Sequence, residues 1–324
     1  AEEYPLEYMG ASPYDPRIAL RLVRRCRRER LDILHVTDFA ASTWGRIAGR
    51  AAGVPVIVHV RSHHSPQQPR GFPLHAAAAY RLLAPFTDCA IAISESVREF
   101  ATHSMGFERA QVEVMNNPLA RSSFRASEPG AGAAIRRRHG IPRDAPLVGS
   151  VTRFHSVKGI HHLVGALPLL VERVPDAHLL LVGQGPEEGR LKAMAADLGV
   201  LERVRFAGYR EDVQSYYEAF DVSAVPSLEE GFGNVALEAM ASGTPVVASD
   251  LGGLREIVSD GRNGLLVPAA RPDALAAALA GVLSDPDLAH RLSEAGRDRA
   301  REFSLEVYVE RLVDLYRRVS NRNA

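Results

Sequence analysis

Two glutamates eight residues apart are well suited to bind a sugar. Glu230 lies in the glycine-containing segment 229–234, and Glu238 lies in the apolar run that follows it. A carboxylate offers several acceptor lone pairs and no donor, so each can accept hydrogen bonds from two sugar hydroxyls at once. Glu238 therefore fits a ribose, and Glu230 fits a second sugar.

Small residues accompany the first glutamate. Gly231 and Gly233 let the backbone approach a ligand closely, and residues 222–225 before them read as a strand. The helix expected to follow presents unpaired N–H groups and a positive dipole end, which together favour a phosphate. Helical side chains lean toward the N-terminus, so Glu230 and Glu238 are expected to face the same cleft.

A second cluster, Arg153 and Lys158, follows the apolar run 147–152. The chain has only two lysines, Lys158 and Lys192. Two cations can bracket a diphosphate and stabilise the charge that develops on it, a role that a metal ion often takes. We therefore expect no metal cofactor, and we interpret the motif 285–287, Asp-Pro-Asp, as a helix break and cap.

Short apolar runs alternate with longer segments of helical spacing, which predicts parallel strands joined by helices. Expected strands cover 32–36, 55–60, 89–93 and 111–115, then 147–152, 178–182, 204–207, 222–225, 245–248 and 264–267. Helices are expected at 16–30, 42–52, 74–85, 94–105, 272–284, 288–303 and 305–319. Ligands of such sheets lie outside the carboxyl ends of the strands.

Length indicates two domains, since single cores stop growing near 250–300 residues and this chain has 324. A stretch at 117–132, rich in Pro, Gly and small polar residues, is expected to be the linker. We place an N-terminal domain at 1–130 and a C-terminal domain at 131–304. A last helix at 305–324 is expected to pack back on the N-terminal domain.

The composition argues against several classes of protein. Lys+Arg and Asp+Glu are both 39, so the chain lacks the net positive charge of a general nucleic-acid binder. Cys26 and Cys89 lack metal or redox spacing and suit a reducing cytoplasm. No apolar stretch of membrane-spanning length is visible. We expect a cytoplasmic protein, with peripheral contact at the inner membrane face as an open alternative.

Three motifs occur in an order that resembles retaining GT-B glycosyltransferases of family 4. They are Arg153 with Lys158-Gly159, then Gly183-Gln184-Gly185-Pro186, then Glu230-Gly231-Phe232-Gly233 with Glu238-Ala239-Met240. The glutamate pair is the specific part, because the Gly183 turn occurs in many α/β proteins. The resemblance implies an α/β fold of the GT-B type, in which two Rossmann-like domains with parallel sheets face each other across a cleft.

The resemblance also assigns roles. Arg153 and Lys158 would contact the diphosphate of a nucleotide sugar, linked to UDP or GDP, and Glu238 would bind its ribose. Glu230 would meet the transferred sugar, close to the amides around Phe232, Gly233 and Asn234. Gly183 and Tyr209 would lie at the donor site as well, Tyr209 beside the base. The implied reaction transfers a hexosyl unit with retention to a glycan, lipid or small-molecule acceptor.

The N-terminal half resembles the acceptor domain of that family less closely. Relatives place a histidine after the second of its similar strands, where this chain offers Arg61, His63 and His64 as candidates. The family opens with a strand and a glycine-rich turn, and neither occurs before Asp32. We therefore expect this domain to be incomplete, being either cut short in this sequence or a shortened form.

Three other classes remain to be weighed. A GT-B epimerase or phosphorylase shares the architecture, but the glutamate pair favours a transferase. A non-catalytic nucleotide-sugar-binding or scaffold protein would bind a donor without transferring its sugar. A dinucleotide-dependent oxidoreductase ranks low, because no Gly-x-Gly-x-x-Gly follows a strand in the first half.

Overall fold

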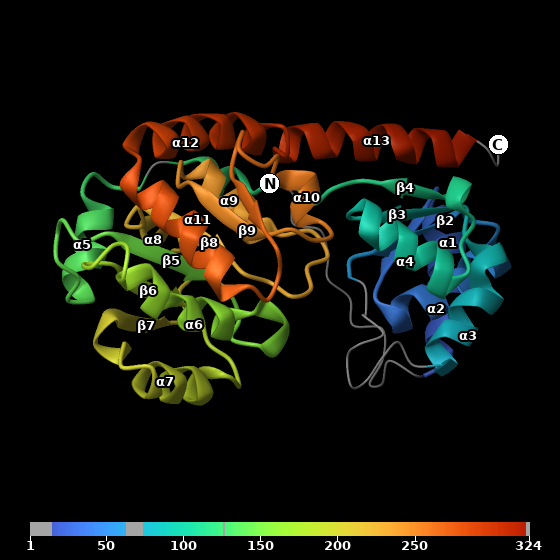
Figure 1. Cartoon of the computed structure of the whole chain (residues 1–324). Coiled ribbons are helices and arrows are strands. Elements are labelled where there is room, and N and C mark those ends of the chain that lie inside the picture. The colour runs from blue at the N-terminus through green and yellow to red at the C-terminus, as the bar shows by residue number, and fades with distance from the viewer. Residues whose placement is uncertain (1–14, 63–73, 126, 322–324) are drawn as a thin grey trace. The chain divides into compact units, whose positions relative to one another are not determined.

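A computed structural model describes residues 15–62, 74–125 and 127–321, and in it the chain divides into two α/β units (Figure 1). Unit 1 contains the described residues up to Asn116 and those from Tyr308 on, and unit 2 contains Asn117–Val307. In the described part of the chain, no helix combines the length and the apolarity needed to cross a membrane.

The division between the units lies earlier than the sequence placed it. The segment after Asn116 belongs to unit 2 because hydrogen bonds tie it there. The amide of Leu119 donates to the carbonyl of Phe303 at 2.8 Å, and the amide of Ser127 donates to Glu218 Oε1 at 2.8 Å. Composition alone indicated a linker, but it could not reveal these distant partners.

Unit 1 is built on a four-stranded parallel sheet of order β1-β2-β3-β4. Its strands are β1 (Leu34–Thr37), β2 (Val56–Val60), β3 (Cys89–Ala92) and β4 (Val112–Val114). Its helices are α1 (Arg17–Glu29), α2 (Phe39–Ala52), α3 (Leu74–Leu83), α4 (Glu95–Met105) and most of α13 (Leu305–Asn321), with short 3-10 turns η1 (Ala84–Phe86) and η2 (Arg109–Gln111).

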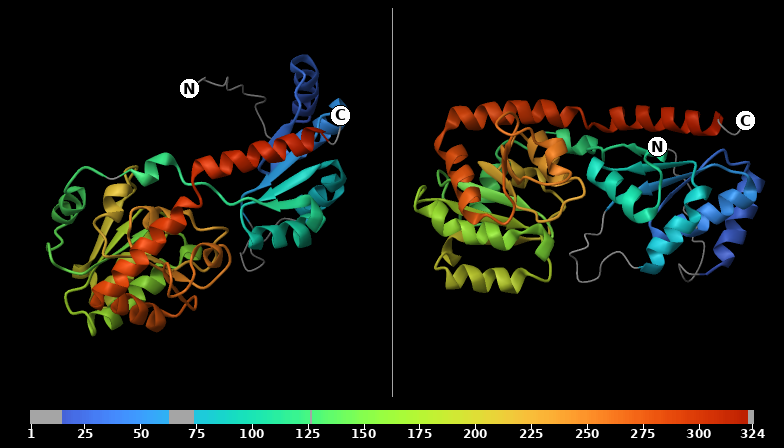
Figure 2. Two further views of the ribbon diagram at one scale, coloured as in Figure 1. Left: turned by 90° about the horizontal axis from the view of Figure 1, so that it is seen from above. Right: turned by 45° about the vertical axis from the view of Figure 1, so that its right-hand side comes forward.

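Helix α13 covers one face of this sheet (Figure 2). Leu315 and Val319 are buried against Ile57 and Ile91. Side chains alternate between the faces of a strand, so the neighbouring residues of β2 point the other way, toward α2. The last helix therefore completes the core of unit 1.

Unit 2 contains a six-stranded parallel sheet of order β10-β9-β8-β5-β6-β7. Its strands are β5 (Leu147–Val151), β6 (His178–Val182), β7 (Val204–Gly208), β8 (Val222–Val225), β9 (Val246–Ser249) and β10 (Leu265–Val267). Its helices are α5 (Ala131–Arg138), α6 (Ile160–Val171), α7 (Glu188–Asp197), α8 (Gln214–Tyr217), α9 (Asn234–Ala241), α10 (Leu254–Ile257), α11 (Pro272–Ser284) and α12 (Pro286–Arg301), with 3-10 turns η3 (Arg121–Phe124), η4 (Ser156–Lys158) and η5 (Leu201–Arg203).

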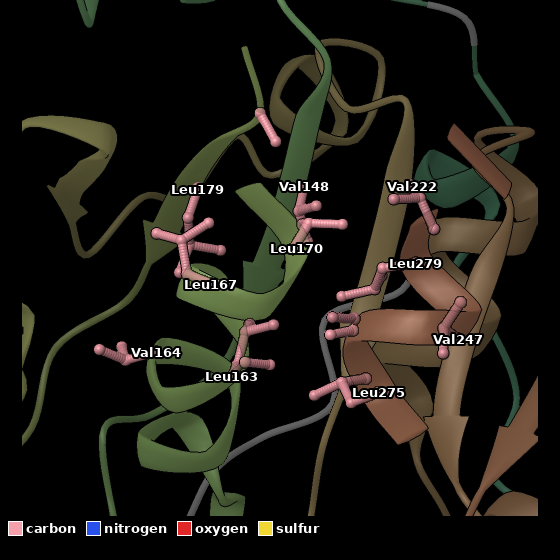
Figure 3. Close-up of a cluster of buried hydrophobic side chains, with 14 of the residues drawn as sticks. Val148, Leu163, Val164, Leu167, Leu170, Leu179, Val222, Val247, Leu275 and Leu279 are labelled. Atoms are coloured by element: carbon pink, nitrogen blue, oxygen red, sulfur yellow. The ribbon is translucent and has the colours of Figure 1, made fainter. Parts of the chain in front are cut away.

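The core of unit 2 lies between its strands and the helices α6 and α11. Figure 3 shows Leu163 and Leu167 of α6 and Leu279 of α11 in one cluster of buried side chains with Val148 of β5 and Val222 of β8. Near-continuous apolar strands such as these are typical of a parallel sheet covered on both faces. This packing fixes the strands, and the strands fix the loops at their carboxyl ends.

A helix cap explains the only Asp-x-Asp motif. Asp285 lies just before α12, where its side chain accepts a hydrogen bond from the amide of Leu288 at 2.9 Å. Pro286 begins the helix, at the position where a missing N–H costs nothing. The expected role of this motif as a helix break and cap is confirmed.

Candidate functional site

The strand order of unit 2 defines where a ligand should bind. Counted from β5 as first, the order reads 3-2-1-4-5-6, which is the Rossmann order. The chain leaves β5 for β6 on one side and returns to β8 on the other, so the switch point lies between β5 and β8 (Figure 1). Crevices form at such points outside the carboxyl ends of the strands.

The loops that follow β5 and β8 carry Lys158 and Glu230, and the structure brings these side chains together. Lys158 Nζ lies 2.8 Å from Glu230 Oε2, and the hydroxyl of Ser227 donates to the same oxygen at 3.1 Å. The side chains of Lys158 and Glu230 are 22% and 12% exposed, so the pair is largely shielded from water but still open on one side. A charge-assisted hydrogen bond there is stronger than one in bulk solvent.

Backbone contacts hold these two loops side by side. The amide of Leu228 donates to the carbonyl of Val157 at 2.8 Å. Gly159 has a φ of +64°, and a Cβ there would lie 2.0 Å from the carbonyl oxygen of Pro226. Only glycine fits this approach, so the glycine after Lys158 sets the distance between the two loops.

Gly183 plays a similar packing role after β6. Its φ is +135°, and a Cβ there would lie 1.8 Å from the carbonyl oxygen of Thr152 in the loop after β5. The amide of Gly183 donates to the carbonyl of Gly208 at the end of β7 at 2.9 Å. Tyr209 comes next and is 60% exposed. The glycine thus joins the ends of three neighbouring strands.

Glu238 lies in the second turn of α9, in surroundings unlike those of Glu230. The hydroxyl of Tyr217, at the end of α8, lies 3.2 Å from Glu238 Oε2 and 3.2 Å from the carbonyl oxygen of Val235. Burial raises the pKa of Glu238, and the Tyr217 hydrogen bond opposes that rise. No hydrogen bond joins Glu238 to Glu230.

Of the residues between the two glutamates, some can offer only their backbone to a ligand and others can also offer a side chain. The side chain of Phe232 is buried and packs on Phe303 with ring centroids 5.6 Å apart, so only its backbone is available to a ligand. Gly233 precedes α9 with a φ of +110°, which a side chain would strain. Gly231 is partly exposed, and Asn234 begins α9 with an exposed side chain.

Arg153 lies just beyond β5 and is exposed. Within residues 15–62, 74–125 and 127–321, its guanidinium forms no hydrogen bond or ion pair. It therefore has all its donors available at the edge where the Lys158–Glu230 pair lies.

The acceptor-side candidates are in unit 1. Arg61 follows β2 and is exposed, whereas His63 and His64 lie outside the described residues. His59, one residue before Val60, was not singled out from the sequence. Burial lowers its pKa to about 4, with His35 and then Arg61 adding to the effect.

His59 is thus a neutral imidazole at the carboxyl end of its strand. It stacks on His35 with ring centroids 5.3 Å apart, and among the residues that the structure describes its buried Nε2 has no hydrogen-bond partner. Its neighbour His35 shares a hydrogen bond of 2.6 Å with the hydroxyl of Tyr316 on α13.

Sequence reasoning missed three residues of the unit 2 site. Tyr217 and Ser227 contact the two glutamates, and neither carries a motif that points to this role. Gly253 follows β9, where its Cβ would lie 2.3 Å from the Cα of Phe232. The paired glycines 252–253 after a strand were a usable signal for a third loop at the same edge.

Family models match both units. The model for glycosyl transferases group 1 matches residues 133–299, and the glycosyl transferase 4-like domain model matches residues 3–118. The first match covers half of the chain. The chain therefore belongs to the glycosyl transferases group 1 family and has the GT-B fold, as the sequence motifs predicted.

Curated relatives agree with this assignment. D-inositol 3-phosphate glycosyltransferase of Corynebacterium urealyticum is 39% identical over 218 residues, which are 64% of this chain and 51% of the relative. The chain thus spans about half the length of that protein. The uncharacterized glycosyltransferase MJ1607 of Methanocaldococcus jannaschii is 30% identical over 299 residues, covering 89% of this chain and 76% of the relative.

A solved structure shares the fold. The Anabaena protein Alr3699/HepE, crystallised with UDP, has a TM-score of 0.83 and 24% identity, covering 92% of this chain and 81% of that one. The same protein has been crystallised with UDP and glucose and with UDP-glucose.

Proposed function

We propose that the chain is a retaining glycosyltransferase that transfers a hexosyl unit from a nucleotide-diphosphate sugar to an acceptor. The observation that carries the proposal is the contact of Lys158 Nζ with Glu230 Oε2 at 2.8 Å, at the switch point of a Rossmann sheet. A cation and a carboxylate held there suit the two halves of a donor, because one attracts phosphate and the other accepts sugar hydroxyls.

In this proposal each charged side chain binds one part of the donor. Lys158 and the free guanidinium of Arg153 hold the diphosphate. Glu230 accepts hydroxyls of the transferred sugar through Oε1, because Oε2 is already held by Lys158 and Ser227. Glu238 accepts the ribose hydroxyls one loop further on.

Bond cleavage leaves negative charge on the nucleotide diphosphate. Arg153 and Lys158 would stabilise that charge without a metal ion, since donors fixed in advance need no reorganisation during the reaction. We propose that the acceptor hydroxyl attacks from the face that the diphosphate leaves and gives its proton to the departing diphosphate, which retains the anomeric configuration. The transition state then has oxocarbenium character.

UDP is the nucleotide that we favour, with GDP as the alternative. The support is the fold shared with Alr3699/HepE, whose structures contain UDP and UDP-glucose. The acceptor would be a glycan, a lipid or a small molecule that meets unit 1 near Arg61. We place the protein in the cytoplasm, where peripheral contact with a membrane would serve a lipid acceptor.

A thermal-shift comparison of UDP-, GDP- and ADP-sugars, with wild type and Glu238→Ala, tests the donor site. A ligand at 100 times its Kd stabilises a protein by about 2.7 kcal/mol, so one nucleotide class should raise the Tm of wild type clearly. Glu238→Ala should lose most of that rise. If no nucleotide sugar shifts the Tm of the wild-type chain, the proposal is wrong.

Product analysis tests the reaction itself. NMR of the anomeric proton should show the configuration of the donor in the product, and activity should survive EDTA. An inverted product would overturn retention, and loss of activity in EDTA would overturn metal independence.

A further inference from the structure

Tyr217 is held in place by unit 2 itself, independently of any ligand. It is 1% exposed and ends the four-residue helix α8. Thr244 donates to its carbonyl at 2.8 Å, and its ring packs on Phe220 with centroids 6.0 Å apart. Its hydroxyl is therefore a fixed point against which a neighbouring side chain can be oriented.

That neighbour is Glu238. One hydroxyl proton faces two acceptors, Glu238 Oε2 and the carbonyl of Val235, each at 3.2 Å. In the described part of the chain, no group hydrogen-bonds to Glu238 Oε1. The contact thus fixes one oxygen of the carboxylate toward α8 and leaves the other available.

We propose that Tyr217 is the residue that positions Glu238 for the nucleotide ribose, and that its hydroxyl thereby sets the affinity for the nucleotide part of the donor. The inference rests on the ribose-binding role given to Glu238 above. It assigns a new role to a residue that carries no motif and that lies beneath the site.

The charge state of Glu238 gives the contact a measurable consequence. Burial raises the pKa of Glu238, and the Tyr217 hydrogen bond lowers it. Burial, followed by the charge of Glu238, raises the pKa of Tyr217 well above its usual value, so this phenol stays protonated and remains a donor. Burial and the Tyr217 hydrogen bond are the two influences on the pKa of Glu238, and no charged group adds to them. In the described chain the elements that pack most closely on α9 are β8, β9, α10, α12 and η3, and α8 contacts it through Tyr217.

The ionised carboxylate is the form that accepts two ribose hydroxyls. Nucleotide affinity should therefore fall as pH falls through the raised pKa of Glu238. Removing the Tyr217 hydroxyl removes the one influence that lowers this pKa, so the fall should move to a higher pH.

The test compares Tyr217→Phe with Tyr216→Phe by calorimetric titration of UDP between pH 5 and 8. Tyr217→Phe should weaken UDP binding about tenfold at neutral pH, the loss expected for one hydrogen bond to a charged group. The midpoint of the pH dependence should rise. In turnover assays the KM for the donor should rise while kcat changes little.

Tyr216 provides a matched control. It is the neighbouring residue of α8 and is 2% exposed. Its hydroxyl accepts a hydrogen bond from Arg210 Nε at 2.9 Å and shares one of 3.2 Å with His139 Nε2. Tyr216→Phe removes an equally buried hydroxyl and should leave the pH midpoint of wild type unchanged. An equal shift in both variants would mean that a general loosening of α8 is responsible, and would overturn the proposal.

Two further outcomes separate this proposal from the proposed function. If Glu238→Gln binds UDP as wild type does, the ribose role of Glu238 fails. If Glu238→Gln weakens binding but Tyr217→Phe leaves affinity and midpoint unchanged, only the role of Tyr217 fails. Should Tyr217→Phe not fold, 3-fluorotyrosine at position 217 keeps the hydroxyl as a stronger donor, and the midpoint must then move to a lower pH.

Discussion

The two candidate carboxylates come from one strand–loop–helix unit, yet their surroundings are opposite. Glu230 lies in the loop and is held by Lys158, a cation from another loop. Glu238 lies eight residues later in a helix, is partly buried, and is held by Tyr217, an uncharged donor. The same side chain is thus paired with a cation in one place, whereas in the other its partner is uncharged and burial raises its pKa.

This difference teaches how one motif can bind two unlike sugars. A carboxylate paired with a lysine shares its cation with the diphosphate of the donor. A partly buried carboxylate with one phenol partner is independent of that cation, and its raised pKa makes it respond to pH. Glu230 should therefore be sensitive to changes in charge nearby, and Glu238 to protonation.

Removing the charge of Lys158 should have the largest effect on catalysis. Lys158→Ala removes a donor to the departing diphosphate and leaves the shielded Glu230 without its cation. We expect kcat/KM to fall by about 100- to 1000-fold, which corresponds to about 2.7–4 kcal/mol for one such donor. Steady-state kinetics with the preferred nucleotide sugar measures this.

The other lysine is the control. Lys192 is half exposed and pairs with Glu188 on the surface of α7. Exposed pairs of this kind contribute about 0–1 kcal/mol, so Lys192→Ala should behave as wild type. Equal losses in the two variants would argue against any special role for Lys158.

Neutralising each carboxylate in turn should show which one binds the ribose and which one binds the transferred sugar. Glu238→Gln should weaken both UDP and UDP-sugar by about 1.5–3 kcal/mol, the range for hydrogen bonds to a charged group. Glu230→Gln should weaken the UDP-sugar and leave the affinity for UDP nearly unchanged, because UDP lacks the transferred sugar. Calorimetry with both ligands measures this, and identical profiles for the two variants would remove the distinction.

Separating the two loops should have a smaller effect, seen first in stability. Gly159→Ala places a Cβ 2.0 Å from the carbonyl of Pro226, which must move the loop of Lys158 away from the loop of Glu230. Overpacking of this kind costs about 1–3 kcal/mol. Gly140→Ala has a similar positive φ of +62° with nothing within 4 Å, so it reports backbone strain alone. Denaturant unfolding should show Gly159→Ala to be the less stable of the two.

Much of the fold could be predicted because apolar runs mark parallel strands strongly. The expected strand at 222–225 coincides with β8, and the expected strand at 178–182 coincides with β6. The boundary between the units was harder to predict from the sequence, because it depends on contacts between distant residues such as Leu119 and Phe303.

The sequence could predict several residues of the site, but it could not predict which of them contact one another. Motifs pointed to Lys158 and Glu230, but their contact across 72 positions depends on the order of the strands in the sheet. Tyr217 could not be found at all, because a buried tyrosine in a short helix reads as core. The chemistry of Glu238 depends on this residue, which no local pattern singles out.

Helix α13 has a consequence for how the protein is made on the ribosome. The segments of this chain that build unit 1 lie before and after unit 2 in the sequence, so the ribosome translates all of unit 2 between them. Unit 2 can complete its core as soon as its own residues have emerged, whereas the face of Ile57 and Ile91 stays bare until Leu315 and Val319 arrive. The core of unit 1 is therefore completed only after unit 2 has been translated, and a nascent chain that stops before α13 would expose an apolar sheet to chaperones and proteases.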